Sequence, residues 1–362
     1  MQLGIIGLPN AGKSTLFNAL TGAAVPALAY PFCTIDPNVG VVPVPDRRLD
    51  VLQELAGLKA VPATVRFVDI AGLVRGASRG EGLGNRFLAH IREVDGLVHI
   101  VRCFINPNVT HVEGTPDPVR DIEIVNTELC LSDLETVTRR LGRIEKPART
   151  GHKEYLAEVE LLKRVEAELN RGRPVRCMGL GAGERDLLRG LFLLTAKPVL
   201  YVANVAEEAG DDDPLAQAVH RVAAAEGAAA ITLAARFEEE LAALPPEEQK
   251  PFLEDAGLEE SALARLIRAG YALLGLITFF TIRPPEVRAW TIPAGTRAQD
   301  AAGKIHTDMA RGFIRAEVIP FAALVEAGSM AAAREHGLIR LEGRDYIVQD
   351  GDVIYFRFSL TG

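Results

Sequence analysis

Apolar residues along the chain gather in short unbroken runs, separated by glycine-rich turns and by segments with helical spacing. The first run, residues 3–7 (LGIIG), predicts a buried strand, and residues 13–22 (KSTLFNALTG) predict an amphipathic helix that ends at Gly22. Further runs lie at residues 64–72 (TVRFVDIAG), 96–104 (GLVHIVRCF) and 198–205 (PVLYVANV). Because these runs are apolar on both faces, they predict buried parallel strands of an α/β domain.

Two other patterns follow this domain. Residues 131–146 and 154–172 are charged segments with helical spacing on either side of a turn at 147–151, which predicts an inserted helical hairpin, a short antiparallel coiled coil. The C-terminal part has short runs rich in β-branched and aromatic residues, which predict strands of a separate α+β domain. Those runs are residues 276–282, 286–292, 345–349 and 352–358.

Composition narrows the class of protein. A length of 362 residues allows two or three domains, and a net charge of −8 argues against indiscriminate nucleic-acid binding. The apolar runs are too short to span a bilayer, and the N-terminus lacks the features of a signal peptide. The cysteines Cys33, Cys103, Cys130 and Cys177 have no spacing typical of zinc sites or disulfide frameworks, so we expect a cytoplasmic protein.

The strongest chemical signal is residues 7–15 (GLPNAGKST), which match the P-loop pattern G-x-x-x-x-G-K-[ST]. A predicted strand precedes the motif and a predicted helix follows it, as a phosphate-binding loop requires. We therefore expect nucleotide phosphates to be held by Asn10, Ala11, Gly12, Lys13, Ser14 and Thr15. Lys13 would neutralise the β- and γ-phosphates and act in catalysis, and the Ser14 hydroxyl would ligate Mg²⁺.

A second signal predicts a nucleotide-dependent switch. Asp69 ends an apolar strand, where a carboxylate can hold the hydration shell of Mg²⁺, and the Gly72 N–H three residues later can sense the γ-phosphate. Between this motif and the P-loop, Thr34 offers a hydroxyl that can complete the metal site when a triphosphate is bound.

The base-recognition stretch is residues 204–207 (NVAE), where many P-loop switch proteins have Asn-Lys-x-Asp to bind guanine. The longer Glu207 side chain cannot place its carboxylate where the Asp would sit, which removes on the order of 3 kcal/mol of preference for guanine. Asn204 keeps an amide that can pair with adenine, and Val205 offers an apolar contact to the purine. A degenerate GTPase that holds GTP through its phosphates remains the alternative.

Several long motifs resemble the YchF, or Obg-like ATPase, subfamily of the Obg family of P-loop switch proteins. They are residues 7–21, 30–46, 67–85, 204–207, 312–319 and 345–358, so the resemblance covers essentially the whole chain. It implies a P-loop domain at 1–130 and 196–275, an inserted helical domain at 131–195, and a C-terminal TGS domain of β-grasp type at 276–362.

The resemblance also implies activity and partners. It implies a preference for ATP over GTP, Mg²⁺ as cofactor, and association with the ribosome and ribosomal RNA in translation or stress responses. DNA and membranes are not expected partners, and a monomer is expected. It does not decide between a slow ATPase that acts on the ribosome and a nucleotide-gated ribosome- or RNA-binding module whose hydrolysis is incidental.

One departure affects the expected chemistry. Many switch GTPases have a Gln after the D-x-x-G motif that orients the attacking water, and here Leu73 takes that position. The resemblance suggests two substitutes: Asn10 holding a K⁺ ion beside the phosphates, and His111 positioning or activating water. Without the resemblance, a histidine in a polar loop is expected to be exposed to solvent. Ala234 replaces a Ser or Cys of relatives, so a backbone contact from Ala235 to the base is expected without a side-chain contact beside it.

Overall fold

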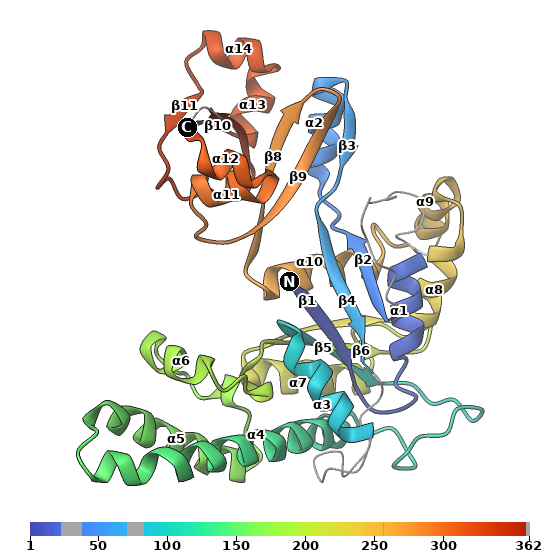
Figure 1. Ribbon diagram of the computed structural model, residues 1–362. Helices are drawn as coiled ribbons and strands as arrows, with labels where there is room; N and C mark the ends of the chain where they lie inside the picture. Colours follow the sequence, from blue (N-terminus) through green and yellow to red (C-terminus); the bar gives the residue numbers. More distant parts are fainter. Residues whose placement is uncertain (23–37, 71–82, 256, 360–362) are drawn as a thin grey trace. The chain divides into compact units, whose positions relative to one another are not determined.

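The computed structural model describes residues 1–22, 38–70, 83–255 and 257–359. These residues form two compact units (Figure 1). The first comprises residues 1–42 and 66–270, and the second comprises residues 43–65 and 271–362.

The first unit is built on a six-stranded sheet in the order β2-β4-β1-β5-β6-β7. The strands β4, β1, β5 and β6 pair in parallel, as the apolar runs predicted, and β7, which was not predicted, adds a parallel edge strand. The strands are β1 (Gln2–Ile6), β2 (Val39–Pro43), β4 (Thr64–Asp69), β5 (Gly96–Arg102), β6 (Val199–Asn204) and β7 (Ala229–Leu233). Every residue of β5 and β6 is buried, because helices cover both faces of the sheet.

Two groups of helices cover this sheet (Figure 1). The group α3 (Leu83–Glu93), α4 (Pro118–Arg149) and α7 (Pro214–Glu226) shares one hydrophobic core with β5 and β6. The helices α1 (Lys13–Gly22) and α8 (Ala235–Ala243) pack against each other and contribute no residue to that core. The unit is completed by α9 (Pro246–Asp255) and α10 (Ala262–Leu273).

A helical hairpin projects from the same unit, as predicted. The second half of α4 packs against α5 (Leu156–Asn170), and Val137, Leu141 and Val165 are among the buried residues between them. The remaining elements of the hairpin region are η2 (Lys153–Tyr155), η3 (Val175–Cys177), α6 (Ala182–Arg189) and η4 (Leu194–Ala196).

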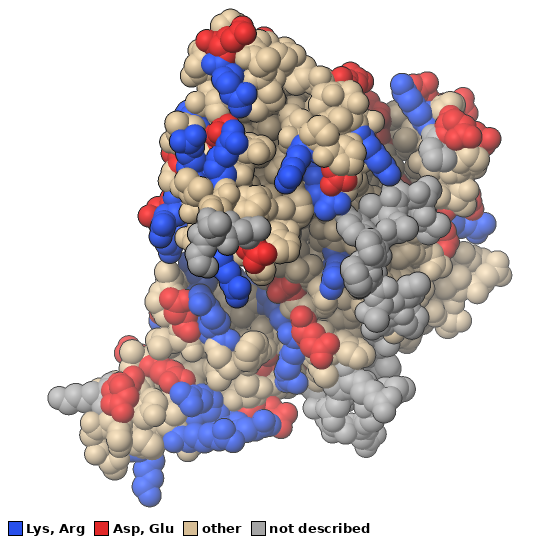
Figure 2. Space-filling model, turned by 45° about the horizontal axis from the view of Figure 1, so that its top comes forward, with Lys and Arg blue, Asp and Glu red and all other residues tan. Residues whose placement is uncertain are grey.

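Ion pairs link the two helices of the hairpin. Arg140 pairs with Glu158 at 2.7 Å, and Lys163 pairs with Glu145 at 2.8 Å. Figure 2 shows the same mixture more widely, with Lys and Arg interspersed with Asp and Glu over the face that it draws. The charges on the hairpin are therefore of both signs, and several of them form ion pairs.

The second unit is α+β and contains a six-stranded sheet in the order β11-β10-β12-β8-β9-β3. Its strands are β3 (Lys59–Val61), β8 (Leu276–Arg283), β9 (Glu286–Pro293), β10 (Phe313–Pro320), β11 (Arg340–Glu342) and β12 (Asp352–Phe358). Its helices are α2 (Arg47–Ala56), α11 (Ala298–Ile305), α12 (Thr307–Arg311), α13 (Phe321–Ala327) and α14 (Met330–Glu335). Without β3, the parallel pair of β8 and β12 at the centre and the strand order are those of a β-grasp.

Two details differ from the expected pattern. Residues 345–349 have the β-branched and aromatic composition of a strand but form only a single bridge, from Ile347 to Arg297, so that strand prediction was wrong. The sheet instead takes β10, which pairs along its length with β12.

Residues 43–65 were expected in the P-loop domain, yet they pack within the second unit. The parallel pairing of β3 with β9 and an Arg48–Asp350 ion pair of 2.8 Å join them to the C-terminal residues. Likewise, α4 crosses the expected boundary between residues 130 and 131 without a break, because its buried face continues from Leu129 to Val137. The three-domain division stays a prediction.

Candidate functional site

The P-loop connects β1 to α1 and needs glycine at two positions. Gly7 has a φ of 150°, and a Cβ there would overlap the carbonyl oxygen of Ile100. Gly12 has a φ of 102°, and a Cβ there would overlap Nδ2 of Asn204. Both glycines are thus required by backbone conformation and by close packing against neighbouring strands. The loop delivers Lys13 as the first residue of α1.

Lys13 is folded into the loop and is only 8% exposed. Its ammonium group donates to the Leu8 carbonyl at 2.8 Å and to the Gly7 carbonyl at 3.2 Å. Burial lowers the pKa of Lys13 to about 8, and the nearby Asp69 carboxylate opposes this shift. The cation therefore already lies at the loop where phosphate oxygens would be bound.

Ser14 and Asp69 come together as the sequence predicted for a metal site. Burial raises the pKa of Asp69, while the charge of Lys13 and a hydrogen bond from Ser14 act in the opposite direction. A hydroxyl and a carboxylate are hard oxygen donors, which suit Mg²⁺. The described residues hold no group of three or more His, Cys, Asp or Glu that could bind a metal. A metal here would depend on nucleotide phosphates and water for its remaining ligands.

Asn204, at the end of β6, is 4% exposed and joins two parts of the site. Its Nδ2 donates to the Ala11 carbonyl and its Oδ1 accepts from the Ala235 N–H, both at 2.9 Å. The Ala235 amide was expected to contact the base, whereas in the structure it donates to Asn204. Because Ala234 makes no side-chain cap to α8, the Asn204 amide takes that role. One N–H and one lone pair of Asn204 remain for a ligand.

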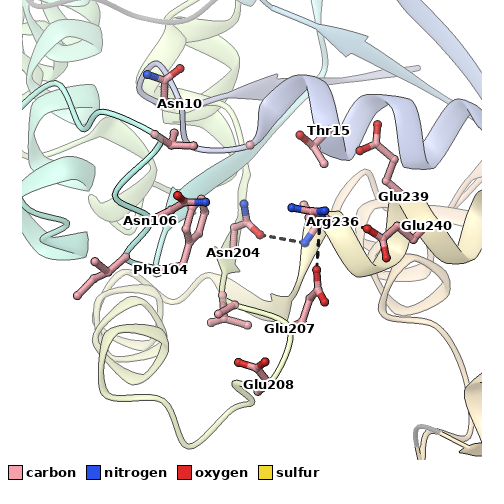
Figure 3. A pocket seen from close by; sticks show the side chains of 16 residues that line it. Asn10, Thr15, Phe104, Asn106, Asn204, Glu207, Glu208, Arg236, Glu239 and Glu240 are labelled. Carbon is pink, nitrogen blue, oxygen red and sulfur yellow. Dashed lines mark hydrogen bonds and ion pairs between the residues drawn. The ribbon is translucent and has the colours of Figure 1, made fainter.

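A pocket of about 820 Å³ opens beside the P-loop (Figure 3). Its volume is that of a typical small-molecule site. Three parts of the chain line it. The P-loop and α1 contribute Asn10, Gly12 and Thr15, and residues 103–111, here called the pocket loop, contribute Phe104, Ile105, Asn106 and Val109. The end of β6, the turn after it and α8 contribute Asn204, Val205, Ala206, Glu207, Glu208, Ala235, Arg236, Glu239 and Glu240. The structure thus brings three of the predicted phosphate-binding residues, Asn10, Gly12 and Thr15, and the predicted base-recognition residues to one cavity.

The end of the pocket away from the P-loop is acidic, and Arg236 lies among its carboxylates. Glu207 forms an ion pair of 3.6 Å with Arg236, which also pairs with Glu240 at 3.1 Å (Figure 3). The Glu207 side chain is 47% exposed. Val205 lines the pocket but is only 5% exposed and packs in the core. Phosphates would be repelled from this end, which suits an uncharged base.

His111 lies in the pocket loop and is buried, with 6% exposure, so the expectation of a solvent-exposed histidine was wrong. Its Nε2 lies 2.8 Å from Oδ2 of Asp121, and its Nδ1 accepts the Glu113 N–H at 3.1 Å. Since Nδ1 acts as an acceptor, the proton must be on Nε2, which donates to Asp121. A contact between His111 and water would require one of these bonds to open.

The remaining predicted residues divide into two groups. Thr34, Gly72, Leu73 and Cys33 lie outside the described residues. Asn10 has a φ of 62°, and its Nδ2 donates to the Thr110 carbonyl at 3.0 Å, which links the P-loop to the pocket loop. A K⁺ ion beside Asn10 stays a prediction.

Sequence reasoning missed Phe104, Asn106 and Arg236, which line the pocket, and Arg102, which bonds to the main chain of the pocket loop. No motif covers Phe104, Asn106 or Arg236, because each gains its role only when distant segments meet. Arg102 did leave a signal, since it is the only charged residue of the buried strand β5 and stands at its carboxyl end. Ligand sites of parallel sheets lie at those ends.

The doubly covered parallel sheet, the glycine loop leading into α1 and the adjoining pocket define a P-loop nucleoside triphosphatase. In agreement, residues 2–131 match the family model MMR_HSR1, described as "50S ribosome-binding GTPase". Residues 276–359 match the model YchF-GTPase_C, described as "Protein of unknown function (DUF933)".

The chain belongs to the YchF family. It is 50% identical over 364 residues to "Ribosome-binding ATPase YchF" of Bacillus subtilis, covering 99% of this chain and 100% of that protein. It is also 50% identical over 360 residues to the protein of the same name from Escherichia coli O157:H7, covering 99% of each chain. The solved structure of the Schizosaccharomyces pombe YchF GTPase matches with a TM-score of 0.89 and 35% identity, over 99% of this chain and 97% of that one. These names disagree on whether the nucleotide is ATP or GTP.

Proposed function

We propose that this chain is a ribosome-associated switch protein that slowly hydrolyses ATP to ADP and phosphate. The observation that carries the proposal is the continuity of the P-loop with the 820 Å³ pocket through Asn204, which contacts both. A nucleotide can place its phosphates on the glycine loop and its base toward Glu207. Association with the ribosome is proposed because the relatives are named ribosome-binding ATPases. Contact with ribosomal RNA, a monomeric state and a cytoplasmic location remain predictions.

Each residue of the site has a proposed part. Lys13 binds the β- and γ-phosphates, and Ser14 with Asp69 holds Mg²⁺ directly or through water. The metal supplies positive charge that neutralises the phosphates during transfer. Thr34 is proposed to complete the metal site when a triphosphate is bound, Gly72 to sense the γ-phosphate, and His111 to position water.

Adenine is the proposed base because Glu207 is directed to Arg236, and its longer side chain does not place the carboxylate where an Asp would accept from guanine. We therefore expect wild-type protein to bind ATP more tightly than GTP. Glu207→Asp should raise GTP affinity several-fold, since it restores an acceptor for the guanine edge and releases Arg236. Calorimetry with both nucleotides on wild type and variant measures this directly.

Glu208→Asp is the matched control, because Glu208 lines the same pocket without an ion pair to Arg236 among the described residues. That control should leave the ratio of ATP to GTP affinity unchanged. A wild-type preference for GTP would replace the proposal with the alternative, a GTPase whose base-recognition motif has degenerated. The Lys of the guanine-binding motif Asn-Lys-x-Asp would fall at position 205, but we do not expect Val205→Lys to raise GTP affinity further, because position 205 is buried and an ammonium there is costly.

The affinity for ATP should depend on pH through Lys13. Its pKa of about 8 in the free protein means that the ammonium form is lost as pH rises above 8. Binding requires that form, so the dissociation constant should rise about tenfold between pH 7 and pH 9. Calorimetry across this range checks the effect, and Lys13→Ala should show a nearly flat profile. An equal slope in Lys13→Ala would assign the titration to another group.

Adding ribosomes to the hydrolysis assay distinguishes an ATPase that acts on the ribosome from a nucleotide-gated binding module. The proposed ATPase should hydrolyse ATP faster when purified ribosomes are added, as measured by phosphate release at saturating ATP. Binding to ribosomes that depends on nucleotide but leaves turnover unchanged would instead indicate a nucleotide-gated binding module.

A further inference from the structure

Arg102 is a buried cation at the base of the pocket loop. It ends β5 and is only 3% exposed. In the sheet it stands directly opposite Asn204 on β6, and the next amide, that of Cys103, donates to the Asn204 carbonyl at 2.8 Å. Arg102 is therefore paired, on the neighbouring strand, with Asn204, the proposed base-recognition residue.

The side chain of Arg102 bonds main-chain carbonyls at both ends of the pocket loop. Near the start, Nε donates to Phe104 at 3.1 Å and Nη2 donates to Asn106 at 3.5 Å. Near the end, Nη2 donates to Val109 at 2.9 Å and Nη1 donates to Thr110 at 3.4 Å. The guanidinium carbon also lies 4.6 Å from the centre of the Phe104 ring, within the range of a cation–π contact.

These bonds hold one wall of the pocket. Phe104, Asn106 and Val109 line the cavity, and the Thr110 carbonyl that Arg102 contacts also accepts from Asn10 of the P-loop. Figure 3 shows Phe104 and Asn106 on the side of the cavity that faces Asn204. Main-chain carbonyls that point into the loop would lose hydrogen bonds to water, which is unfavourable unless a donor lies among them. Arg102 is that donor.

We propose that Arg102 is a positioning residue that holds the pocket loop as the wall beside the base of the nucleotide. The inference rests on the proposed function, because it assumes that this pocket takes a nucleotide base. A planar guanidinium carries five donors in a fixed fork and can serve both ends of the loop at once. A lysine ammonium is a compact charge with three donors and cannot span them.

The test compares a ligand that has a base with one that lacks it. Arg102→Lys should raise the dissociation constant for Mg·ATP about tenfold or more, because the wall beside the base is no longer held. The same variant should change the dissociation constant for magnesium tripolyphosphate by less than twofold, because tripolyphosphate needs only the P-loop and the metal site. Arg140→Lys is the matched control, since the Arg140 guanidinium also donates to oxygen acceptors, those of the Glu158 carboxylate, and contacts an aromatic ring, but on the helical hairpin.

Each outcome has a separate meaning. An equal loss for both ligands would show general loosening of the site, and no loss for ATP would show that the loop holds without Arg102; either result overturns the inference. If Arg102→Lys does not fold, Arg102→Gln replaces it without leaving a buried charge. If wild-type protein binds GTP and not ATP, the proposed function fails, and the same comparison with GTP still tests Arg102.

Discussion

Lys13→Ala should weaken the binding of Mg·ATP by about a hundredfold while the protein stays folded. The variant removes two charge-assisted hydrogen bonds to phosphate oxygens, worth about 3 kcal/mol together. Folding should be retained for two reasons. Burial of the Lys13 ammonium is unfavourable, as its lowered pKa shows, and no ion pair in the described residues depends on it. Calorimetry gives the affinity, and circular dichroism with thermal unfolding gives the stability.

Lys197→Ala is the matched control for this prediction. Lys197 also donates to main-chain carbonyls, those of Arg92 and Val94, and burial likewise lowers its pKa. It does not line the pocket. The control should lose some stability without losing nucleotide affinity. If Lys13→Ala bound Mg·ATP as tightly as Lys197→Ala did, the P-loop would not be the phosphate site.

The parts of the site that the sequence predicted are those that one continuous segment supplies. The P-loop is such a segment, because the strand, the two glycines, Lys13 and Ser14 follow each other within residues 2–14. Asp69 was found for the same reason, since its position at the end of an apolar strand is a local property. Local pattern was enough wherever chain order and spatial order agree.

The role of Asn204 shows where this reasoning stopped. Its residue type suggested base recognition. No neighbouring residue in the sequence indicated that its side-chain amide would also donate to the Ala11 carbonyl and accept from the Ala235 N–H. Those partners lie 193 and 31 residues away along the chain. Only tertiary structure reveals that the same side chain supports the P-loop and caps α8.

The fold was predictable to the same degree. Strands β5 and β6 were evident because they are buried on both faces, so their composition alone identifies them. The position of residues 43–65 was not, since the pairing of Lys59 with Glu286 depends on a contact between segments far apart in the chain. The error at residues 345–349 has the opposite cause. Tyr346, Ile347 and Val348 have the aromatic and β-branched side chains typical of a strand, and Tyr346 and Val348 do pack toward the core, but the chain makes only one bridge here.

His111 is the residue whose role the structure makes most open to experiment. It was expected to position water, yet both of its ring nitrogens are bonded within the protein, to Asp121 and to the Glu113 amide. Two roles follow from this geometry. In the first, Asp121 holds the Nε2 proton, and Nδ1 exchanges the Glu113 amide for the attacking water during hydrolysis. In the second, His111 only anchors the end of the pocket loop to α4.

His111→Ala should lower kcat for ATP hydrolysis by about a hundredfold and change the dissociation constant of ATP by no more than about threefold. A group that acts on water contributes only near the transition state, so its loss leaves binding of ATP largely unchanged. An anchor would behave differently, because a loosened pocket loop would weaken binding as well. Single-turnover hydrolysis and calorimetry on the same preparation separate the two quantities.

The comparison variant is His111→Gln, whose Nε2 can donate to Asp121 as the imidazole does but which has no basic nitrogen. If His111 acts on water, His111→Gln should bind ATP normally and remain as slow as His111→Ala. If it is an anchor, the restored bond to Asp121 should return both binding and turnover toward wild type. Recovery of turnover in His111→Gln would therefore remove His111 from the chemistry and leave it as part of the wall that the Arg102 guanidinium holds.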